Sequence, residues 1–255
     1  MSLTADLKNF RPGDAERIAL LGRALAAAFA CGLLLSFKLW VSTRQYPLSP
    51  ALGLLPAFAF PLDYLSLAAL LALLGASAFA ARPRPFLLSL LALSLLLCLQ
   101  DQTRWQPWVY QYLFMLAALA LHDGRGASDA RRRAAVDACR LVVAGVYFWS
   151  GLQKLNANFF GEIWPWVVGP YAQHLPGAAG RGLSAAGILV PLAEVFVGVG
   201  LLTRRLRTTA VVLALATHAA VLALFAPLGR NAVVWPWNVA SGVFVFVLFW
   251  RARET

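Results

Sequence analysis

Long apolar runs recur along this sequence from end to end, and they constrain its fold more than any other feature. A helix needs about 20 mostly apolar residues to cross the roughly 30 Å hydrocarbon core of a bilayer. Runs of about this length, the third and fourth being short, cover residues 20–41, 60–80, 85–100, 107–121, 136–154, 184–202, 208–227 and 233–250. The sequence therefore predicts an all-α, polytopic transmembrane bundle of about eight helices.

Composition supports the membrane prediction. Of the 255 residues, 60% are hydrophobic and 13% are charged, whereas about a quarter of the residues of a soluble domain are charged. We expect a single integral membrane domain over residues 1–255. Its parts are a cytoplasmic tail at 1–17, the helical bundle at 18–250 and a second cytoplasmic tail at 251–255.

Lysine and arginine are unevenly divided between the connections. The tails and every second connection hold fourteen of them: Lys8, Arg11, Arg17, Arg82, Arg84, Arg125, Arg131, Arg132, Arg133, Arg204, Arg205, Arg207, Arg251 and Arg253. The alternate connections hold five: Arg44, Arg104, Lys154, Arg181 and Arg230. Because basic residues accumulate in cytoplasmic loops, both termini are predicted to be cytoplasmic in a protein of the cell membrane. The same bias explains the net charge of +11, with the lipid bilayer as partner and no nucleic acid.

The connections on the opposite, outward side are rich in Trp, Pro and short polar residues. "RWQPW", "IWPWVV" and "VVWPWN" repeat one composition at three helix entrances, where Pro presets the first turn. An interfacial aromatic belt accounts for single Trp residues, and lipid phosphates account for exposed arginines. The repetition favours the walls of one outward cavity, with arginines suited to bind an anion. The candidate ligand-binding residues are Arg104, Trp105, Trp108, Tyr112, Asn156, Asn158, Trp166, Arg230, Asn231, Trp235 and Asn238.

Three of the ionisable residues inside or at the end of apolar runs are candidates for function. Glu194 and His218 fall in the middle of two neighbouring runs, where a charge is costly and usually has a partner. They are predicted as an intramembrane polar pair, acting either as glue between helices or as a relay for protons or substrate. Lys154, at the end of the fifth run, is either a snorkelling lysine or a candidate catalytic base, because partial burial lowers the pKa of lysine.

Cysteine indicates neither a metal centre nor a dithiol motif. Cys31, Cys98 and Cys139 are widely spaced, with no Cys-x-x-Cys and no Cys/His cluster. We expect them to be small apolar residues within helices, and we predict no metal site.

Three segments, in this order, resemble the vitamin K-dependent gamma-carboxylase-like membrane proteins, the HTTM (horizontally transferred transmembrane) family. "DQTRWQPWVYQY" at 101–112 is similar to the family's Asp, Trp and Tyr-x-Tyr segment, "VYFWSGLQKLNANFFG" at 146–161 to its lysine motif, and "THAAVLALFAPLGRNAVVWPWN" at 217–238 to its His and Asn segment. The resemblance covers most of residues 18–250. It implies that Lys154 is the base that deprotonates a hydroquinone, at a site facing outward.

Two departures argue against gamma-glutamyl carboxylation itself. Trp108 stands where the family has a functional histidine, and the 255 residues contain no large lumenal domain. Bacterial members of the family include proteins needed for maturing secreted peptide toxins, and DoxX-like relatives that partner thiol-disulfide enzymes.

Two functions of different classes follow from these expectations. The first is a cavity for a small lipophilic molecule, with a quinone or vitamin K-like hydroquinone as candidate cofactor and Lys154 as base or anion anchor; an enzyme of this kind is carboxylase-like or quinone-linked. The second is a non-catalytic membrane partner for a secreted peptide or a redox protein. Transport through Glu194 and His218 ranks third, because the two halves show no inverted repeat.

Overall fold

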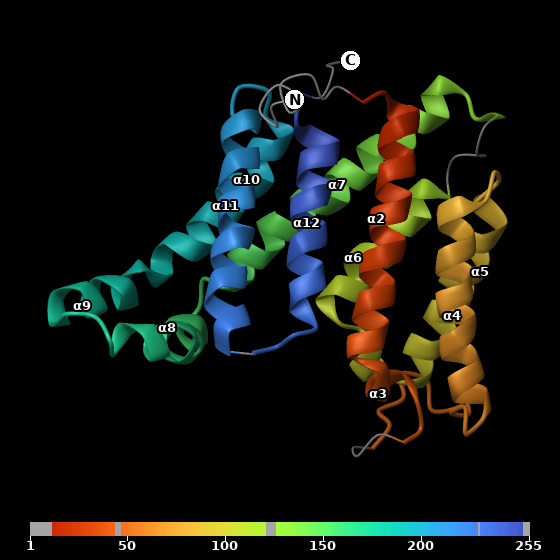
Figure 1. Cartoon of the computed structure of the whole chain (residues 1–255), viewed down its shortest axis with the longest axis horizontal. Helices are drawn as coiled ribbons and strands as arrows, with labels where there is room; N and C mark the ends of the chain where they lie inside the picture. Colours follow the sequence, from red (N-terminus) through yellow and green to blue (C-terminus); the bar gives the residue numbers. More distant parts are fainter. Residues whose placement is uncertain (1–11, 44–46, 121–125, 229, 252–255) are drawn as a thin grey trace. The chain divides into compact units, whose positions relative to one another are not determined.

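The computed structural model describes residues 12–43, 47–120, 126–228 and 230–251. The described residues are helical, with turns and irregular segments between the helices and no strand. Contacts divide the chain into two compact units, Met1–Cys139 and Arg140–Thr255, and the long helix α7 (Asp129–Gln153) contributes to both (Figure 1). The all-α prediction is confirmed for this part of the chain.

Unit 1 is built from α2 (Asp14–Leu35), α3 (Phe37–Trp40), α4 (Leu62–Phe79), α5 (Arg84–Gln100), η1 (Gln102–Arg104), α6 (Pro107–Leu119) and the start of α7. Helix α2 packs against α4 and α6, and α5 packs against the same two helices. The fit of α2 to α6 depends on Gly32, because a Cβ there would lie 2.9 Å from the ring of Trp108. Phe29 completes this core, with its ring centroid 5.7 Å from Trp108.

Unit 2 holds the rest of α7, followed by η3 (Phe159–Ile163), α8 (Trp164–Ala172), α9 (Gly177–Ala185), η4 (Ala186–Ile188), α10 (Leu189–Leu202), α11 (Arg207–Phe225), η5 (Ala226–Leu228) and α12 (Val234–Phe249). Helix α11 packs between α10 and α12, while α8 packs on α9. Helices α7 and α10 approach closely at Gly198, where a Cβ would lie 2.7 Å from the backbone nitrogen of Phe148.

Five helical segments are long and apolar enough to cross a membrane: Asp14–Leu35, Leu62–Phe79, Asp129–Gln153, Gly177–Leu202 and Arg207–Leu228. Two shorter apolar helices, Arg84–Gln100 and Val234–Phe249, also match predicted runs. The remaining run forms α6, whose 13 residues extend about 20 Å, less than the hydrocarbon thickness. These helices indicate a membrane protein, and the total of eight spans stays a prediction.

The segment after Lys154 differs from the expected loop, because most of it is helical. Asn156 starts the turn by accepting a hydrogen bond at Oδ1 from the Phe159 backbone N–H, at 2.9 Å. Pro165 lies in the first turn of α8, where its fixed φ favours a helix. Phe159, Trp164 and Val168 then form a buried cluster. Burial of this cluster stabilises the polar, Trp-rich connection as two helices, α8 and α9.

Candidate functional site

The polar side chains of unit 2 meet along one face of α7. Tyr147, Ser150 and Lys154 are spaced three and four residues apart, a spacing that places side chains on the same side of a helix. Helix α10 contributes Glu194, α11 contributes His218 and α12 contributes Asn238. Four helices of one unit thus supply one group of ionisable and hydrogen-bonding side chains.

Lys154 forms an ion pair with Glu194. The Lys154 Nζ lies 2.6 Å from Glu194 Oε2, and it also donates to Ser150 Oγ at 2.5 Å and to the Ser150 carbonyl at 3.1 Å. An ammonium group has three N–H donors, so all three are used. The side chains are 25% and 13% exposed, respectively, which places the pair inside the unit with a remaining opening.

Small residues let α7 and α10 approach closely enough for this pair to form. A Cβ on Gly151 would lie 2.6 Å from the Pro191 carbonyl oxygen and 2.7 Å from the Val195 backbone nitrogen. Such separations are shorter than any side chain tolerates, so position 151 requires glycine. Lys154 is three residues beyond Gly151, and Glu194 is three residues beyond Pro191. The close crossing therefore fixes the two charged side chains opposite each other.

His218 belongs to a second polar chain. Its Nδ1 lies 2.9 Å from Asn238 Oδ1, and the Asn238 amide nitrogen donates to the Val234 carbonyl at 2.8 Å. Because Asn238 presents its oxygen to the ring, Nδ1–H is the donor and Nε2 is left as an acceptor. The Tyr147 hydroxyl donates to that Nε2. The result is an ordered line from Tyr147 through His218 to Asn238.

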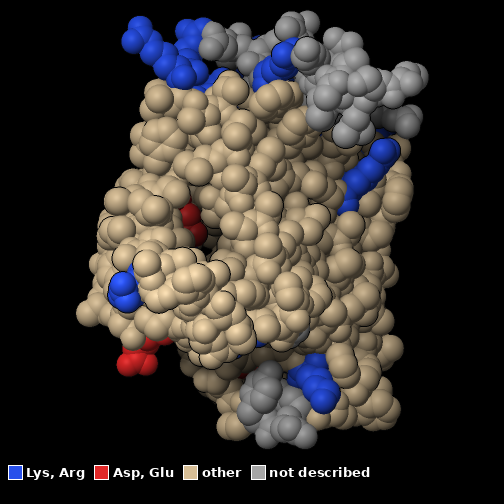
Figure 2. All heavy atoms as spheres, turned by 60° about the vertical axis from the view of Figure 1, so that its left-hand side comes forward, with Lys and Arg blue, Asp and Glu red and all other residues tan. Residues whose placement is uncertain are grey.

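Glu194 and His218, predicted as a pair, each have their own partners. No hydrogen bond joins them among the described residues, but Glu194 lies close enough to interact electrostatically with both His218 and Tyr147. Figure 2 shows acidic atoms set back in a hollow on the side where α8 and α9 come forward, with uncharged surface around them. The ion pair at Glu194 and the hydrogen-bonded line through His218 are therefore neighbours in largely apolar surroundings.

The predicted outer-loop residues of unit 2 form a separate contact group. Arg230 lies over the Trp166 ring, 4.4 Å from its centroid, and donates to the Trp166 carbonyl at 2.9 Å. The Trp235 indole donates to the Arg230 carbonyl at 3.1 Å. Asn231 follows with a positive φ of 45°, a conformation that asparagine tolerates. Arg230 thus joins α8 to the start of α12.

The two remaining asparagines of this set are exposed. Asn156 bonds within its own turn, donating to the Gln153 carbonyl at 2.5 Å. Asn158 lies in the same exposed turn. Among the described residues, no hydrogen bond joins either side chain to the Lys154 and Glu194 pair.

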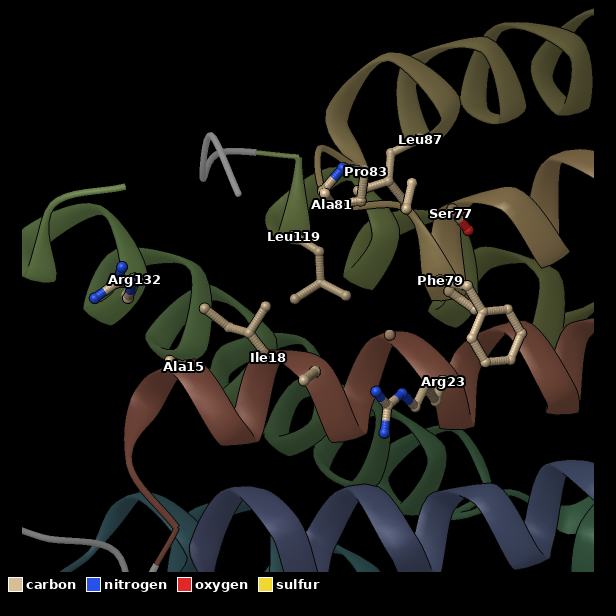
Figure 3. A pocket seen from close by; sticks show the side chains of 14 residues that line it. Ala15, Ile18, Arg23, Ser77, Phe79, Ala81, Pro83, Leu87, Leu119 and Arg132 are labelled. Carbon is tan, nitrogen blue, oxygen red and sulfur yellow. The ribbon is translucent and has the colours of Figure 1, made fainter. Parts of the chain in front are cut away.

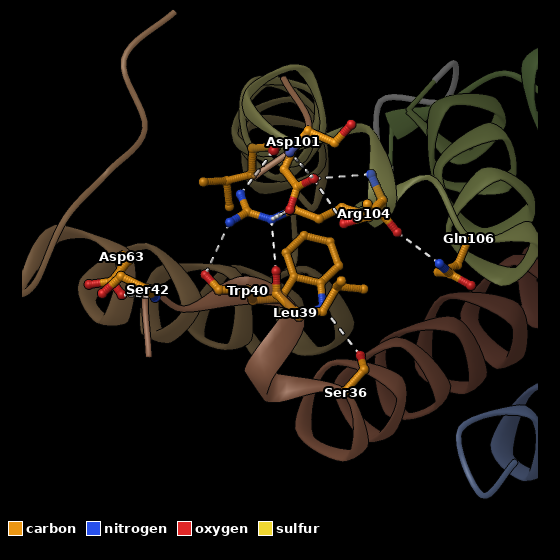
Figure 4. Close-up of polar contacts among 11 residues, drawn as sticks. Ser36, Leu39, Trp40, Ser42, Asp63, Asp101, Arg104 and Gln106 are labelled. Carbon is orange, nitrogen blue, oxygen red and sulfur yellow. Dashed lines mark hydrogen bonds and ion pairs between the residues drawn. The ribbon is translucent and has the colours of Figure 1, made fainter. Parts of the chain in front are cut away.

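The four predicted site residues of unit 1 are mostly packed in its interior. Arg104 is 5% exposed and donates to the carbonyls of Leu39 and Leu97 at 3.0 and 2.9 Å. Its Nε also lies 3.8 Å from Oδ2 of Asp101, three residues earlier in the chain. Figure 4 shows this guanidinium among backbone oxygens from separate segments, so Arg104 joins the α3 region to the end of α5.

Two of the aromatic residues that follow Arg104 line the contact between α2 and α6. Trp108 and Tyr112 are 2% and 1% exposed and pack with Phe29. Trp105 stacks on Tyr110, with centroids 4.7 Å apart. Their role as ligand contacts stays a prediction.

Tyr147 and Ser150 were not among the sequence candidates, although both contact candidate residues. The signal in the sequence was their spacing of seven and four residues before Lys154, which places them on its helix face. In the apolar stretch 141–152, Tyr147 and Ser150 are the two residues with hydroxyl groups.

Within the described residues, no group of three or more His, Cys, Asp or Glu could hold a metal ion. Cys98 and Cys139 are buried and Cys31 is exposed, all as free thiols. Comparisons of the chain with protein-family models, with curated proteins and with solved structures found no match.

Proposed function

We propose that this chain is a polytopic protein of the cell membrane, with eight spans and both termini cytoplasmic, whose unit 2 binds a small lipophilic molecule. The bound molecule exchanges a proton at the Lys154 and Glu194 pair. A quinone or hydroquinone is the ligand class that fits best. The observation that carries the proposal is this ion pair, with Nζ and Oε2 at 2.6 Å, at the junction of apolar helices.

The pair provides a proton acceptor with a fixed orientation. Glu194 Oε2 accepts from Lys154, while Glu194 Oε1 accepts no hydrogen bond from the described residues. The ion pair presents Glu194 as a carboxylate beside the Lys154 ammonium. Oε1 is thus the atom that takes a proton from a hydroxyl, and Lys154 holds the resulting anion by its charge.

A hydroquinone matches this arrangement in polarity. It combines an apolar ring, which favours the surrounding helices, with phenolic hydroxyls that donate to a carboxylate. Deprotonation at Oε1 leaves a phenolate, which Lys154 Nζ stabilises by exchanging its bond to Ser150 for one to the ligand. The base role that the HTTM resemblance implies for Lys154 becomes, in this proposal, a role of the Lys154 and Glu194 pair.

The test is a titration of the purified protein in mild detergent with menadione and menadiol, followed by quenching of tryptophan fluorescence. The proposal predicts saturable quenching by both compounds for the native chain. Lys154→Met/Glu194→Gln removes both charges at nearly constant volume, and is expected to abolish saturable quenching by menadiol. The matched control is Lys38→Met, which removes an exposed lysine of α3 in unit 1 and leaves quenching unchanged.

The proposal fails if the double variant binds menadiol as well as the native chain does while both retain the same helical circular dichroism. An equal loss of menadiol quenching in Lys38→Met also counts against the proposal, because that result assigns the effect to overall charge.

A second function is favoured by the exposed apolar surface of η3 and α8. Trp166 is 54% exposed and Ile163 is 44% exposed, and both lie in the segment expected to face outward. A non-catalytic partner for a secreted peptide or a redox protein would bind there. In that case Trp166→Ala reduces complex formation in a cross-linking assay on cells, whereas Lys154→Met does not; the opposite pattern supports the ligand site.

A further inference from the structure

Unit 1 contains a half-open cavity that is not lined by any of the candidate site residues described above. It measures about 450 Å³ and lies between the first half of α2, the turn from α4 to α5, the end of α6 and the start of α7. This volume is within the range of about 300 to 1,000 Å³ typical of ligand pockets. Because α4 and α6 end there while α2, α5 and α7 begin there, the cavity lies at the level where the helices of unit 1 reach the membrane surface.

The lining combines arginine with apolar side chains. Arg23 and Arg132 supply the positive charge, while Ile18, Leu87, Leu119 and Phe79 supply apolar surface. In Figure 3, Ile18 and Leu119 lie between Arg132 at one end of the view and Phe79 at the other. Leu87 and Leu119 are 3% and 2% exposed and form the floor, whereas Phe79 is 81% exposed. Charge and open apolar surface are therefore present in one cavity.

Arg23 carries the argument furthest. It lies about two and a half turns inside α2, where a charged side chain needs a partner or an aqueous path. No hydrogen bond or ion pair to Arg23 is present among the described residues, although its side chain is exposed. An anion in the cavity would supply the missing partner.

Two acidic residues nearby, Glu16 and Asp129, already have partners. Glu16 Oε2 accepts from the Gly13 backbone N–H at 3.0 Å. Asp129 pairs with Arg132 at 3.0 Å but is itself 91% exposed, at the first turn of α7. The rim adds further positive charge, because Arg82 and Arg84 flank Pro83, a lining residue. The site therefore suits an anion whose remaining part is apolar.

We propose that this cavity binds an anionic phospholipid, with Arg23 contacting its phosphate, Arg132 adding positive charge at the other end of the lining, and the acyl chain lying over Phe79. The shared chemistry is a phosphate group, which a lipid or free phosphate could provide. The open apolar rim at Phe79 favours the lipid, because free phosphate leaves that surface uncovered. This site is independent of the ion pair in unit 2.

The test is native mass spectrometry of the protein in detergent with added phosphatidylglycerol, phosphatidylcholine of the same chains, or inorganic phosphate. We expect phosphatidylglycerol to bind with the highest affinity. Arg23→Gln and Arg132→Gln should each weaken it about fivefold, the effect typical of one basic residue near a membrane surface. Gly22→Leu fills open space in the cavity wall and keeps both arginines, so it should remove binding through shape alone.

Two matched controls separate the cavity from general effects. Arg205→Gln removes an equal charge in unit 2, and Gly75→Leu adds the same side chain at an open position of α4 that does not line the cavity. Both should bind phosphatidylglycerol like the native chain. Equal affinity for the two lipids overturns the proposal, as does undiminished binding in Gly22→Leu, or a response to inorganic phosphate that survives Gly22→Leu.

Discussion

A lysine whose three N–H groups are all bonded is held in one position. Lys154 is in this condition, with Glu194 and both oxygens of Ser150 as acceptors. Removing its charge leaves Glu194 as an uncompensated anion inside the unit. Removing both charges leaves only two neutral side chains. The energetic consequence of each change therefore differs in a way that can be measured.

Lys154→Met is predicted to lower the free energy of unfolding by about 3 kcal/mol, the low end for breaking a buried ion pair, because the pair retains some exposure. Lys154→Met/Glu194→Gln should recover most of this loss. Thermal melting in detergent, followed by circular dichroism, measures both. A double variant no more stable than Lys154→Met would show that the pair does not contribute to stability as a unit.

Asn238 is predicted to stabilise the protein through its hydrogen bond with His218. Asn238→Ala leaves the His218 Nδ1–H without its acceptor and should cost about 1 to 2 kcal/mol, the usual effect of an unpaired buried donor. The control is Asn158→Ala, an exposed position expected to change stability by less than about 0.5 kcal/mol. Equal melting temperatures for the two variants would contradict the Tyr147, His218 and Asn238 line.

At this scale the sequence predicted that Glu194, His218 and Lys154 lie within or at the end of apolar helices. It did not predict which of these side chains pair with each other. Glu194 and His218 fall near the centres of neighbouring runs, so a direct pair was the simplest expectation. Which side chains pair depends on the rotation of each helix about its own axis. Helices α10 and α11 are apolar throughout, so their sequences do not define this rotation. Lys154 at the end of α7 faces Glu194 only because Gly151 allows α7 and α10 to approach closely.

At the scale of elements, the close crossing of α7 and α10 is the feature on which the site depends. A Cβ added at Gly151 would lie 2.6 Å from the backbone of α10, whereas a Cβ added at Gly145, six residues earlier in α7, would have nothing within 4 Å. These two glycines lie in one helix and differ only in their surroundings. Substitutions at these two positions therefore separate the effect of packing from the effect of intrinsic helix propensity.

Gly145→Ala is predicted to leave stability unchanged or raise it by up to about 1 kcal/mol, because alanine is the better helix former. Gly151→Ala should destabilise the protein, because its methyl group forces α7 away from α10 and weakens the Lys154 ion pair. Melting temperatures of the two variants in the same detergent check this. Similar values would show that α7 and α10 are not in close contact.

Most of the helices could be predicted from the sequence, since each long apolar run is mostly helical. The connection after Lys154 could not, because its polar and aromatic composition is typical of a loop. Its order comes from burial of Phe159, Trp164 and Val168 in a cluster against which Leu183 of α9 and Val190 of α10 pack. Such contacts arise only when α8 folds back on α9, and no local pattern specifies that. The division into two units was likewise not evident, because the apolar runs continue through it.

At the scale of the whole molecule, the uneven distribution of arginine predicts the orientation in the membrane. Ser128, before α7, should face the cytoplasm and Gln173, after α8, should face outward; both positions are exposed. In a chain with Cys31→Ala, a membrane-impermeant maleimide added to intact cells should label Gln173→Cys and not Ser128→Cys. Lysed cells should label both. Labelling of Ser128→Cys in intact cells would contradict the topology.

The most direct test of the central claim, a ligand site at the Lys154 and Glu194 pair, is mass spectrometry of the small molecules that co-purify with the protein in mild detergent. The native chain is predicted to retain a quinone-class molecule in a fixed ratio to protein, and Lys154→Met/Glu194→Gln to lose it while keeping its helical content. Identical extracts from the native chain and the double variant would contradict the claim.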